Sequence, residues 1–65
     1  MNKREATKSV IEDATSARKL LLDAKRQFIS GEISRSGDSF DVALGLIAKC
    51  SDRAYRIGQG CYEDN

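Results

Sequence analysis

The stretch ATSARKLLLDAKRQF, residues 14–28, decides the fold, because its apolar residues recur at helical spacing. Alternating steps of four and three residues give one stripe, which consists of Val10, Ala14, Ala17, Leu21, Ala24 and Phe28. This is the spacing by which one helix packs along another. Half of the stripe is alanine, and alanine lets two helix axes approach to the short end of the usual ~8–10 Å separation. The stretch therefore predicts a helix that packs closely against a second helix.

Capping residues and glycines set the expected boundaries of two helices. The first is predicted over about residues 3–30, because Asn2 and Glu5 have the spacing of a capping box and Gly31 can end a helix. The segment SGEISRSGDS, residues 30–39, predicts a loop over about residues 31–38, with Ile33 packed back on the helix ends. A second helix is expected over about residues 39–57, with Asp38 or Ser39 as its cap. A loose acidic tail is expected over residues 58–65.

Two helices joined by so short a loop predict an all-α fold, an antiparallel helical hairpin in a single domain of residues 1–65. If Phe28 faces Phe40 beside the loop, small residues meet small residues further along. The expected pairs are Leu21 with Ile47, Ala17 with Cys50, Ala14 with Ala54, and Val10 with Ile57.

The size of the chain favours a second subunit. In 65 residues the free energy of burying a core roughly cancels the conformational entropy that folding removes. Small chains gain the missing stability from disulfides, a metal or oligomerisation. With two cysteines and no histidine, neither a disulfide in a reducing cytoplasm nor a zinc site is expected. The sequence has no secretion signal and no membrane-spanning run, so we expect a cytoplasmic protein that dimerises.

More apolar surface is present than one hairpin interface needs. On the second helix it covers about 200°, whereas one interface needs roughly 100°. Single exposed apolar residues are common on proteins, which is the alternative explanation. Aligned surplus on both helices instead predicts a symmetric homodimer, a four-helix bundle. The predicted dimer interface consists of Ile11, Leu22, Ile29, Leu44, Leu46 and Tyr55.

No pattern in the sequence predicts catalysis, a metal site or a cofactor. Cys50 lies on the apolar face of the second predicted helix and is expected to be a small buried residue, whereas Cys61 lies beyond that helix. A catalytic thiolate needs a cationic neighbour, most often histidine, which the chain lacks. Gly58 and Gly60 follow a helix, whereas a phosphate-binding loop precedes one. We therefore do not expect an enzyme.

Nucleic-acid binding is the alternative to protein binding. Eleven lysines and arginines stand against ten acidic residues, so the net charge is only +1. In the predicted hairpin, Arg53 and Arg56 come near Lys3, Arg4 and Lys8, which makes a modest basic patch. Acidic residues in the same region dilute it, and no third helix is available to support a recognition helix.

The segment KSVIEDATSARKLLLDAKRQFISGEISRSGDSFDVALGLIAKCSDRAYRIGQG, residues 8–60, resembles the small early proteins of the exo–xis region of lambdoid bacteriophages. The resemblance lies in overall sequence character and size, without a diagnostic motif. It implies an accessory protein, made early in infection in the host bacterial cytoplasm, that biases host physiology or the choice between lysis and lysogeny. It implies no catalytic residues.

Together these features predict a non-enzymatic helical module that binds a host or phage protein and alters its activity by occupancy. The residues expected to contact such a partner are Ile33, Arg35 and Val42. The alternative is a nucleic-acid-binding accessory factor that uses the basic patch.

Overall fold

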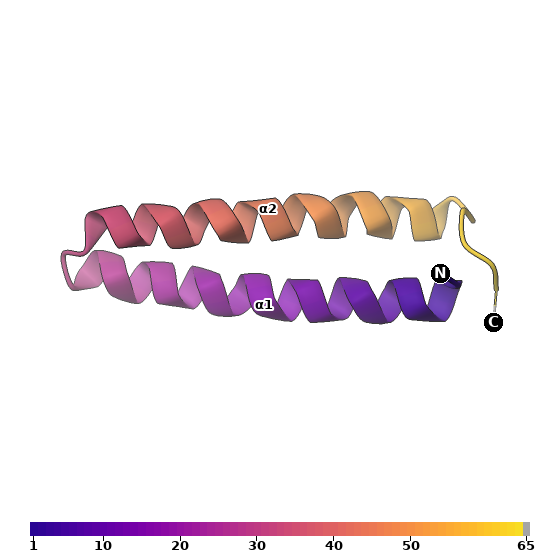
Figure 1. Ribbon diagram of the computed structural model, residues 1–65, viewed down its shortest axis with the longest axis horizontal. Coiled ribbons are helices and arrows are strands. Elements are labelled where there is room, and N and C mark those ends of the chain that lie inside the picture. Colours follow the sequence, from indigo (N-terminus) through magenta and orange to yellow (C-terminus); the bar gives the residue numbers. More distant parts are fainter. Residues whose placement is uncertain (65) are drawn as a thin grey trace.

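The computed structural model describes residues 1–64, which form two long antiparallel helices. Helix α1 spans Lys3–Ile29 and helix α2 spans Ile33–Gly58. Figure 1 shows them side by side over their whole length, joined by a tight turn at one end. The Cα atoms extend over 47 × 14 × 13 Å, so the molecule is a rod two helices wide. The predicted all-α helical hairpin is confirmed.

Helix α1 begins and ends where the sequence predicts. The side-chain Oδ1 of Asn2 accepts a hydrogen bond of 2.8 Å from the backbone N–H of Glu5, which satisfies one of the free amides of the first turn. At the other end Gly31 has a φ of +81°, a left-handed conformation that costs glycine little and other residues more.

Helix α2 begins earlier than the sequence predicts, so the expected loop over residues 31–38 is wrong. The helix starts at Ile33, its N-cap is Glu32, and neither Asp38 nor Ser39 caps it. Ser36 of the expected loop and Ser39, an expected cap, instead pack against α1. Ser36 is buried and donates a hydrogen bond of 2.7 Å to the carbonyl of Ala24, and Ser39 donates one of 2.8 Å to Oε1 of Gln27. These contacts offset the weak helix preference of the segment.

The shorter turn also changes which residues face each other. The Ser36–Ala24 hydrogen bond fixes one level of the hairpin, and the thiol of Cys50, 3.6 Å from the carbonyl of Val10, fixes another. Halfway between these levels lie Ala17 and Ala43, both buried. The predicted pairing of Ala17 with Cys50, and the pairs in the same register, are therefore wrong, because they assumed a longer loop.

We call the contact between the two helices the seam. Its residues are all buried or half-buried and recur in steps of three and four: Ala6, Val10, Asp13, Ala17, Leu20, Ala24 and Gln27 of α1, and Ser36, Ser39, Ala43, Leu46, Cys50, Arg53 and Ile57 of α2. Of the predicted stripe, Val10, Ala17 and Ala24 lie in the seam. Ala14, Leu21 and Phe28 lie beside it, and Phe28 is 63% exposed.

The chain after α2 is not the loose tail that the sequence predicts. The backbone N–H of Lys3 donates a hydrogen bond of 2.7 Å to the carbonyl of Glu63, and the Lys3 ammonium lies 3.3 Å from the carboxylate of Asp64. Tyr62 is half-buried. Because α1 begins at this point, the tail supplies an acceptor for one of its free amides. Asn65, the last residue of the predicted tail, lies outside the described residues.

The start of α2 can be tested at two glycines. Gly37 lies inside the helix, and an added Cβ would meet nothing within 4 Å. We expect Gly37→Ala to raise the free energy of unfolding by about 0.5–1 kcal/mol, because alanine loses less backbone entropy in a helix. Gly31→Ala has equal space but a positive φ, so we expect it to lower that free energy by about 1 kcal/mol. Urea unfolding followed by circular dichroism measures both, and a destabilising Gly37→Ala would contradict the early start of α2.

Candidate interaction surface

The interior of the hairpin is made of very small side chains. The buried residues among those described are Ala6, Ala17, Ala24, Ala43 and Ser36, and no large side chain there is fully buried. Each buried methyl group removes little apolar surface from water, and hydrophobic stabilisation scales with that surface. The two helices therefore lie close together without enclosing a core of large residues.

The large apolar residues lie along one side of the seam. Ala14, Leu21 and Phe28 each follow a seam residue of α1 by four positions, and Phe40 and Ile47 do the same on α2. Residues four apart lie on neighbouring parts of a helix surface, so these residues form a row on each helix. In a seven-residue repeat lettered a to g, the seam residues occupy positions a and d, and these two rows occupy position e. Because e positions face each other in an antiparallel pair of helices, the two rows lie on the same side of the hairpin.

We call this surface the side face. It consists of Ile11, Ala14, Leu21 and Phe28 of α1 and Ile33, Phe40, Leu44 and Ile47 of α2. Its large residues are exposed except for Leu21, which is half-buried. The register places Phe28 level with Ile33, Leu21 with Phe40, and Ala14 with Ile47. The side face is thus an apolar strip that runs along both helices.

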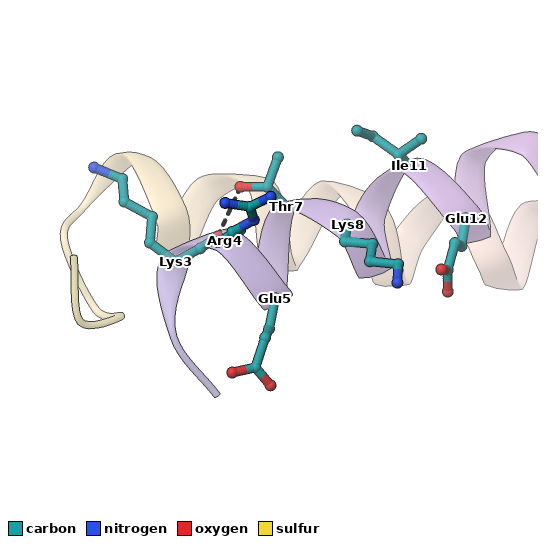
Figure 2. A pocket seen from close by; sticks show the side chains of 7 residues that line it. All are labelled: Lys3, Arg4, Glu5, Thr7, Lys8, Ile11 and Glu12. Atoms are coloured by element: carbon teal, nitrogen blue, oxygen red, sulfur yellow. Dashed lines mark hydrogen bonds between the residues drawn. The ribbon is translucent and has the colours of Figure 1, made fainter. Parts of the chain in front are cut away.

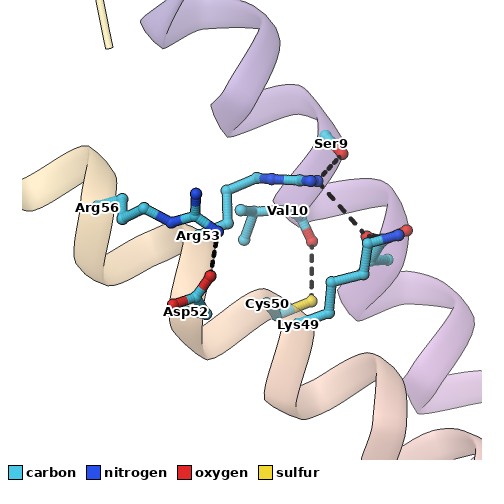
Figure 3. A network of polar contacts seen from close by, with 8 residues as sticks. Ser9, Val10, Lys49, Cys50, Asp52, Arg53 and Arg56 are labelled. Atoms are coloured by element: carbon cyan, nitrogen blue, oxygen red, sulfur yellow. Dashed lines mark hydrogen bonds and ion pairs between the residues drawn. The ribbon is translucent and has the colours of Figure 1, made fainter. Parts of the chain in front are cut away.

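The other side of the seam is polar (Figure 3). The guanidinium of Arg53 donates a hydrogen bond to the hydroxyl of Ser9 and lies 3.9 Å from the carboxylate of Asp13. The ammonium of Lys49 lies 3.9 Å from the same carboxylate. Ser9 and Lys49 come one position before the seam residues Val10 and Cys50, whereas the side-face residues follow such seam residues by one or four positions. The hairpin as a whole therefore has one apolar and one polar side.

Arg53 is a seam residue with a buried polar atom that lacks a hydrogen-bond partner. Its side chain is 19% exposed, and its Nε is buried without a hydrogen-bond partner. One turn further along α2, Arg56 forms a hydrogen bond with the carboxylate of Asp52. That hydrogen bond, together with the charge of Asp52, raises the pKa of Arg56, which stays cationic at all ordinary pH values.

Five of the six residues predicted for the dimer interface are exposed. The exposed fractions are 61% for Ile11, 58% for Leu22, 73% for Ile29, 57% for Leu44 and 67% for Tyr55. Ile11 and Leu44 belong to the side face, whereas the other three lie further round the helices. The sixth, Leu46, is half-buried in the seam, between Ala43 and Cys50. Its predicted place on the outward surface is wrong, because the seam uses the position three residues after Ala43, whereas the predicted contact uses Ile47, four residues after it.

The three residues predicted to bind a partner are also exposed but do not lie together. Ile33 is the first residue of α2 and belongs to the side face. The predicted packing of Ile33 on the helix ends is wrong, because 59% of it is exposed. Arg35 forms an ion pair of 3.3 Å with Glu32 in the first turn of the helix. Val42 immediately precedes the seam residue Ala43, which places it on the polar side.

Sequence reasoning assigned Phe28, Phe40, Leu21 and Ile47 to contacts inside the hairpin, and so missed them as surface residues. A signal for their position is present in the sequence. Small residues recur every seven positions at Ala17 and Ala24 and again at Ser36 and Ala43, and large ones recur four positions after each. That repeat indicates which face of each helix packs against the other, but registers seven residues apart satisfy it equally, so the length of the turn decides between them.

A hollow near the start of α1 offers no enclosed site. Its lining side chains are Lys3, Arg4, Glu5, Thr7, Lys8, Ile11 and Glu12. Figure 2 shows that all of them extend from the first turns of one helix, and that Thr7 bonds back to the carbonyl of Lys3. No described residue of α2 lines this hollow. It is open helix surface that continues the side face at Ile11.

Most of the basic residues near the termini are paired with acids. Lys3 pairs with Asp64, Arg56 with Asp52, and Arg53 lies near Asp13. Within residues 1–64, the bases that form no ion pair all lie on α1: Arg4, Lys8, Arg18, Lys19 and Lys25. The predicted patch around Arg53 and Arg56 is thus largely neutralised, and the remaining positive charge lies along α1.

The cysteines occupy different environments. Cys50 is half-buried in the seam and Cys61 is exposed, and both are free thiols.

Neither α1 nor α2, over the described residues, has an apolar run that could cross a lipid bilayer. No protein-family model matches the chain, and comparisons with curated proteins and with solved structures find no match either.

The close seam can be tested by adding volume to it. We expect Ala17→Leu to lower the free energy of unfolding by about 1–3 kcal/mol, because a buried alanine between two close helices leaves no room for a larger side chain. Ala48→Leu makes the same change at an exposed position of α2, so little loss is expected. Denaturant unfolding of the two variants gives the comparison. Equal stability of both would show that the seam is not closely packed.

Proposed function

We propose that this protein is a helical interaction module that acts by binding protein surfaces and not by catalysis. The observation that carries the proposal is the side face. Phe28, Ile33, Phe40 and Leu44 are each 45–63% exposed on a hairpin whose own interior is alanine. A chain of this size cannot offset its folding entropy with so small an interior. Covering the side face with another apolar surface supplies the missing burial.

The first surface to cover the side face is a second copy of the chain. Two hairpins that meet through their side faces form a symmetric four-helix bundle, in which the side faces and the seams share one core. Ile11 and Leu44 then lie inside the dimer contact. Leu22, Ile29 and Tyr55 lie at its margins or outside it, together with Val42. These remaining exposed apolar residues are the ones available to a further protein.

The biological setting that we propose rests on sequence resemblance. The resemblance to early exo–xis proteins of lambdoid phages supports an accessory role in the bacterial cytoplasm during infection. In that setting the dimer binds a host or phage protein and changes its activity by occupying a surface. This mode of action needs no cofactor.

The dimer predicts two linked measurements on the full chain. Sedimentation at tens of micromolar should give twice the 7.2 kDa of one chain. The thermal midpoint should rise with protein concentration, because dilution favours the unfolded monomer by mass action. A folded 7.2 kDa monomer with a midpoint independent of concentration would contradict the dimer.

A matched pair of substitutions tests the surface itself. Phe40 and Val42 are both exposed apolar residues of α2, at 45% and 55%, but they lie on opposite sides of the seam. We expect Phe40→Glu to abolish the dimer, because it places a charge in the shared core. Val42→Glu should leave the dimer intact. Sedimentation of both variants decides the matter, and equal behaviour would rule out the side face as the interface.

Nucleic-acid binding remains the second candidate, because the unpaired bases lie along one helix. If Arg18, Lys19 and Lys25 contacted phosphates, affinity for DNA would fall steeply as salt is raised. We expect no such binding even at low salt, since Glu5 and Glu12 interrupt the row near the start of α1. A fluorescence-anisotropy titration with duplex and single-stranded DNA measures it. Salt-dependent binding that Lys19→Glu and Lys25→Glu abolish would favour this second function.

A further inference from the structure

We infer that two copies pack with each α1 against the partner's α2, so that both turns lie at the same end of the bundle. The inference rests on the proposed dimer and specifies its arrangement. It is based on the charged residues along the outer edge of the side face, which are named below.

Only two symmetric arrangements bring the two side faces together with their helices aligned. A two-fold axis parallel to the helices places α1 over the partner's α2, with both turns at one end. A two-fold axis perpendicular to the helices, within the contact plane, places α1 over the partner's α1, with the turns at opposite ends. Both arrangements bury the same side face, so apolar burial alone does not choose between them.

The outer edge of the side face is strongly asymmetric in charge. It consists of the side-face residues Ile11 and Leu44 together with the neighbouring outward positions on each helix: residues 4, 8, 15, 18, 22, 25 and 29 of α1, and 34, 37, 41, 48, 51, 55 and 58 of α2. On α1 this edge has no acid and its bases are Arg4, Lys8, Arg18 and Lys25. On α2 it has no base, and Asp41 is its only charged residue. Among the described residues, none of these five charged groups forms an ion pair within the hairpin.

Placing α1 over the partner's α1 brings like charges together. The middle of α1 lies near Ser16, so full overlap of two antiparallel copies sets Lys25 between Arg4 and Lys8 of the other chain. The same contact recurs by symmetry at the other end. Like charges across an interface disfavour that orientation and steer the two copies away from it.

Placing α1 over the partner's α2 brings opposite charges together. A two-fold axis parallel to the helices keeps every residue at its own height, so the hairpin register also applies between the chains. That register places Ala17 level with Ala43, as the contacts at Ala24 and Val10 show. Arg18 therefore lies level with the segment that contains Asp41 of the other chain. An arginine side chain is long enough to reach that carboxylate, and symmetry makes the contact twice.

Distances between the turns distinguish the two arrangements directly. In a chain with Cys50→Ala and Cys61→Ser, shown by sedimentation to remain dimeric, Ser30→Cys provides one spin-labelling site beside the turn. With both turns at one end, the labels lie roughly 20 Å apart, about two interhelical spacings. With the turns at opposite ends, they lie apart by most of the 47 Å length of the molecule. Pulsed electron–electron double resonance measures that distance.

A mixed dimer supplies the control. One chain carries the label at Ser30→Cys and the other at Gln59→Cys, which follows α2 at the far end of the hairpin. Our arrangement predicts the long distance for this mixed pair and the short one for the Ser30 pair. The reverse pattern would overturn the inference while leaving the dimer in place. A monomer, for the unsubstituted chain as well, would overturn the proposed dimer and the inference with it.

Charge reversal tests the contact between the chains. We expect Arg18→Asp to raise the dimer dissociation constant roughly two- to thirtyfold, because symmetry makes the substitution remove two exposed ion pairs. Combining it with Asp41→Arg should restore the original value at low salt. Lys19→Asp makes the same charge change at the adjacent residue, which lies outside the edge, and should have a smaller effect. A double variant no tighter than Arg18→Asp alone would overturn the pairing of these two residues.

Discussion

The close approach of the two helices at Ala17 and Ala43 is the constraint on which the rest of the structure depends. Both residues are buried, and the Ser36–Ala24 and Cys50–Val10 contacts one heptad away on each side keep the same register. Small residues at this level of the seam leave no space there for large ones. The phenylalanines, most isoleucines and most leucines therefore lie beside the seam or on the outer surface of the helices. An interface built on alanine thus determines both the shape of the hairpin and the position of its exposed apolar residues.

The two sides of the seam have different consequences for association. On one side, Ser9, Asp13, Lys49 and Arg53 contact one another and need no further partner beyond water, apart from the buried Nε of Arg53. On the other side, Phe28, Ile33 and Phe40 gain little from the hairpin itself. The polar side fixes the alignment of the helices, and the side face offers burial to whatever covers it. Stability and binding are therefore linked in our proposal. The surface that binds a partner consists of the large apolar residues that the hairpin leaves outside its own interior.

The sequence predicts the helices and the hairpin well, because the cap at Asn2, the turn at Gly31 and the periodic alanines are local signals. It did not predict the start of α2, because Ser36, Gly37 and Ser39 favour a loop by composition. Their role becomes clear only from hydrogen bonds to residues of α1 that lie twelve positions away in the chain. The overlong predicted loop shifts the predicted register by seven residues. Leu46 is predicted outside and the two phenylalanines inside for a different reason: the predicted contact uses the positions four residues after the small residues, whereas the seam uses those three residues after them. The contact between the tail and Lys3 involves the two ends of the chain, and no local pattern signals it.

The central claim is that the side face is covered by a second copy of the chain. Isotope-filtered nuclear Overhauser spectroscopy on a mixture of labelled and unlabelled protein tests it most directly, since it detects only contacts between different chains. Our account predicts contacts between chains from the Phe28 ring to the methyl groups of Ile33 and from the Phe40 ring to those of Leu21. An absence of contacts between chains at the side face would contradict the account.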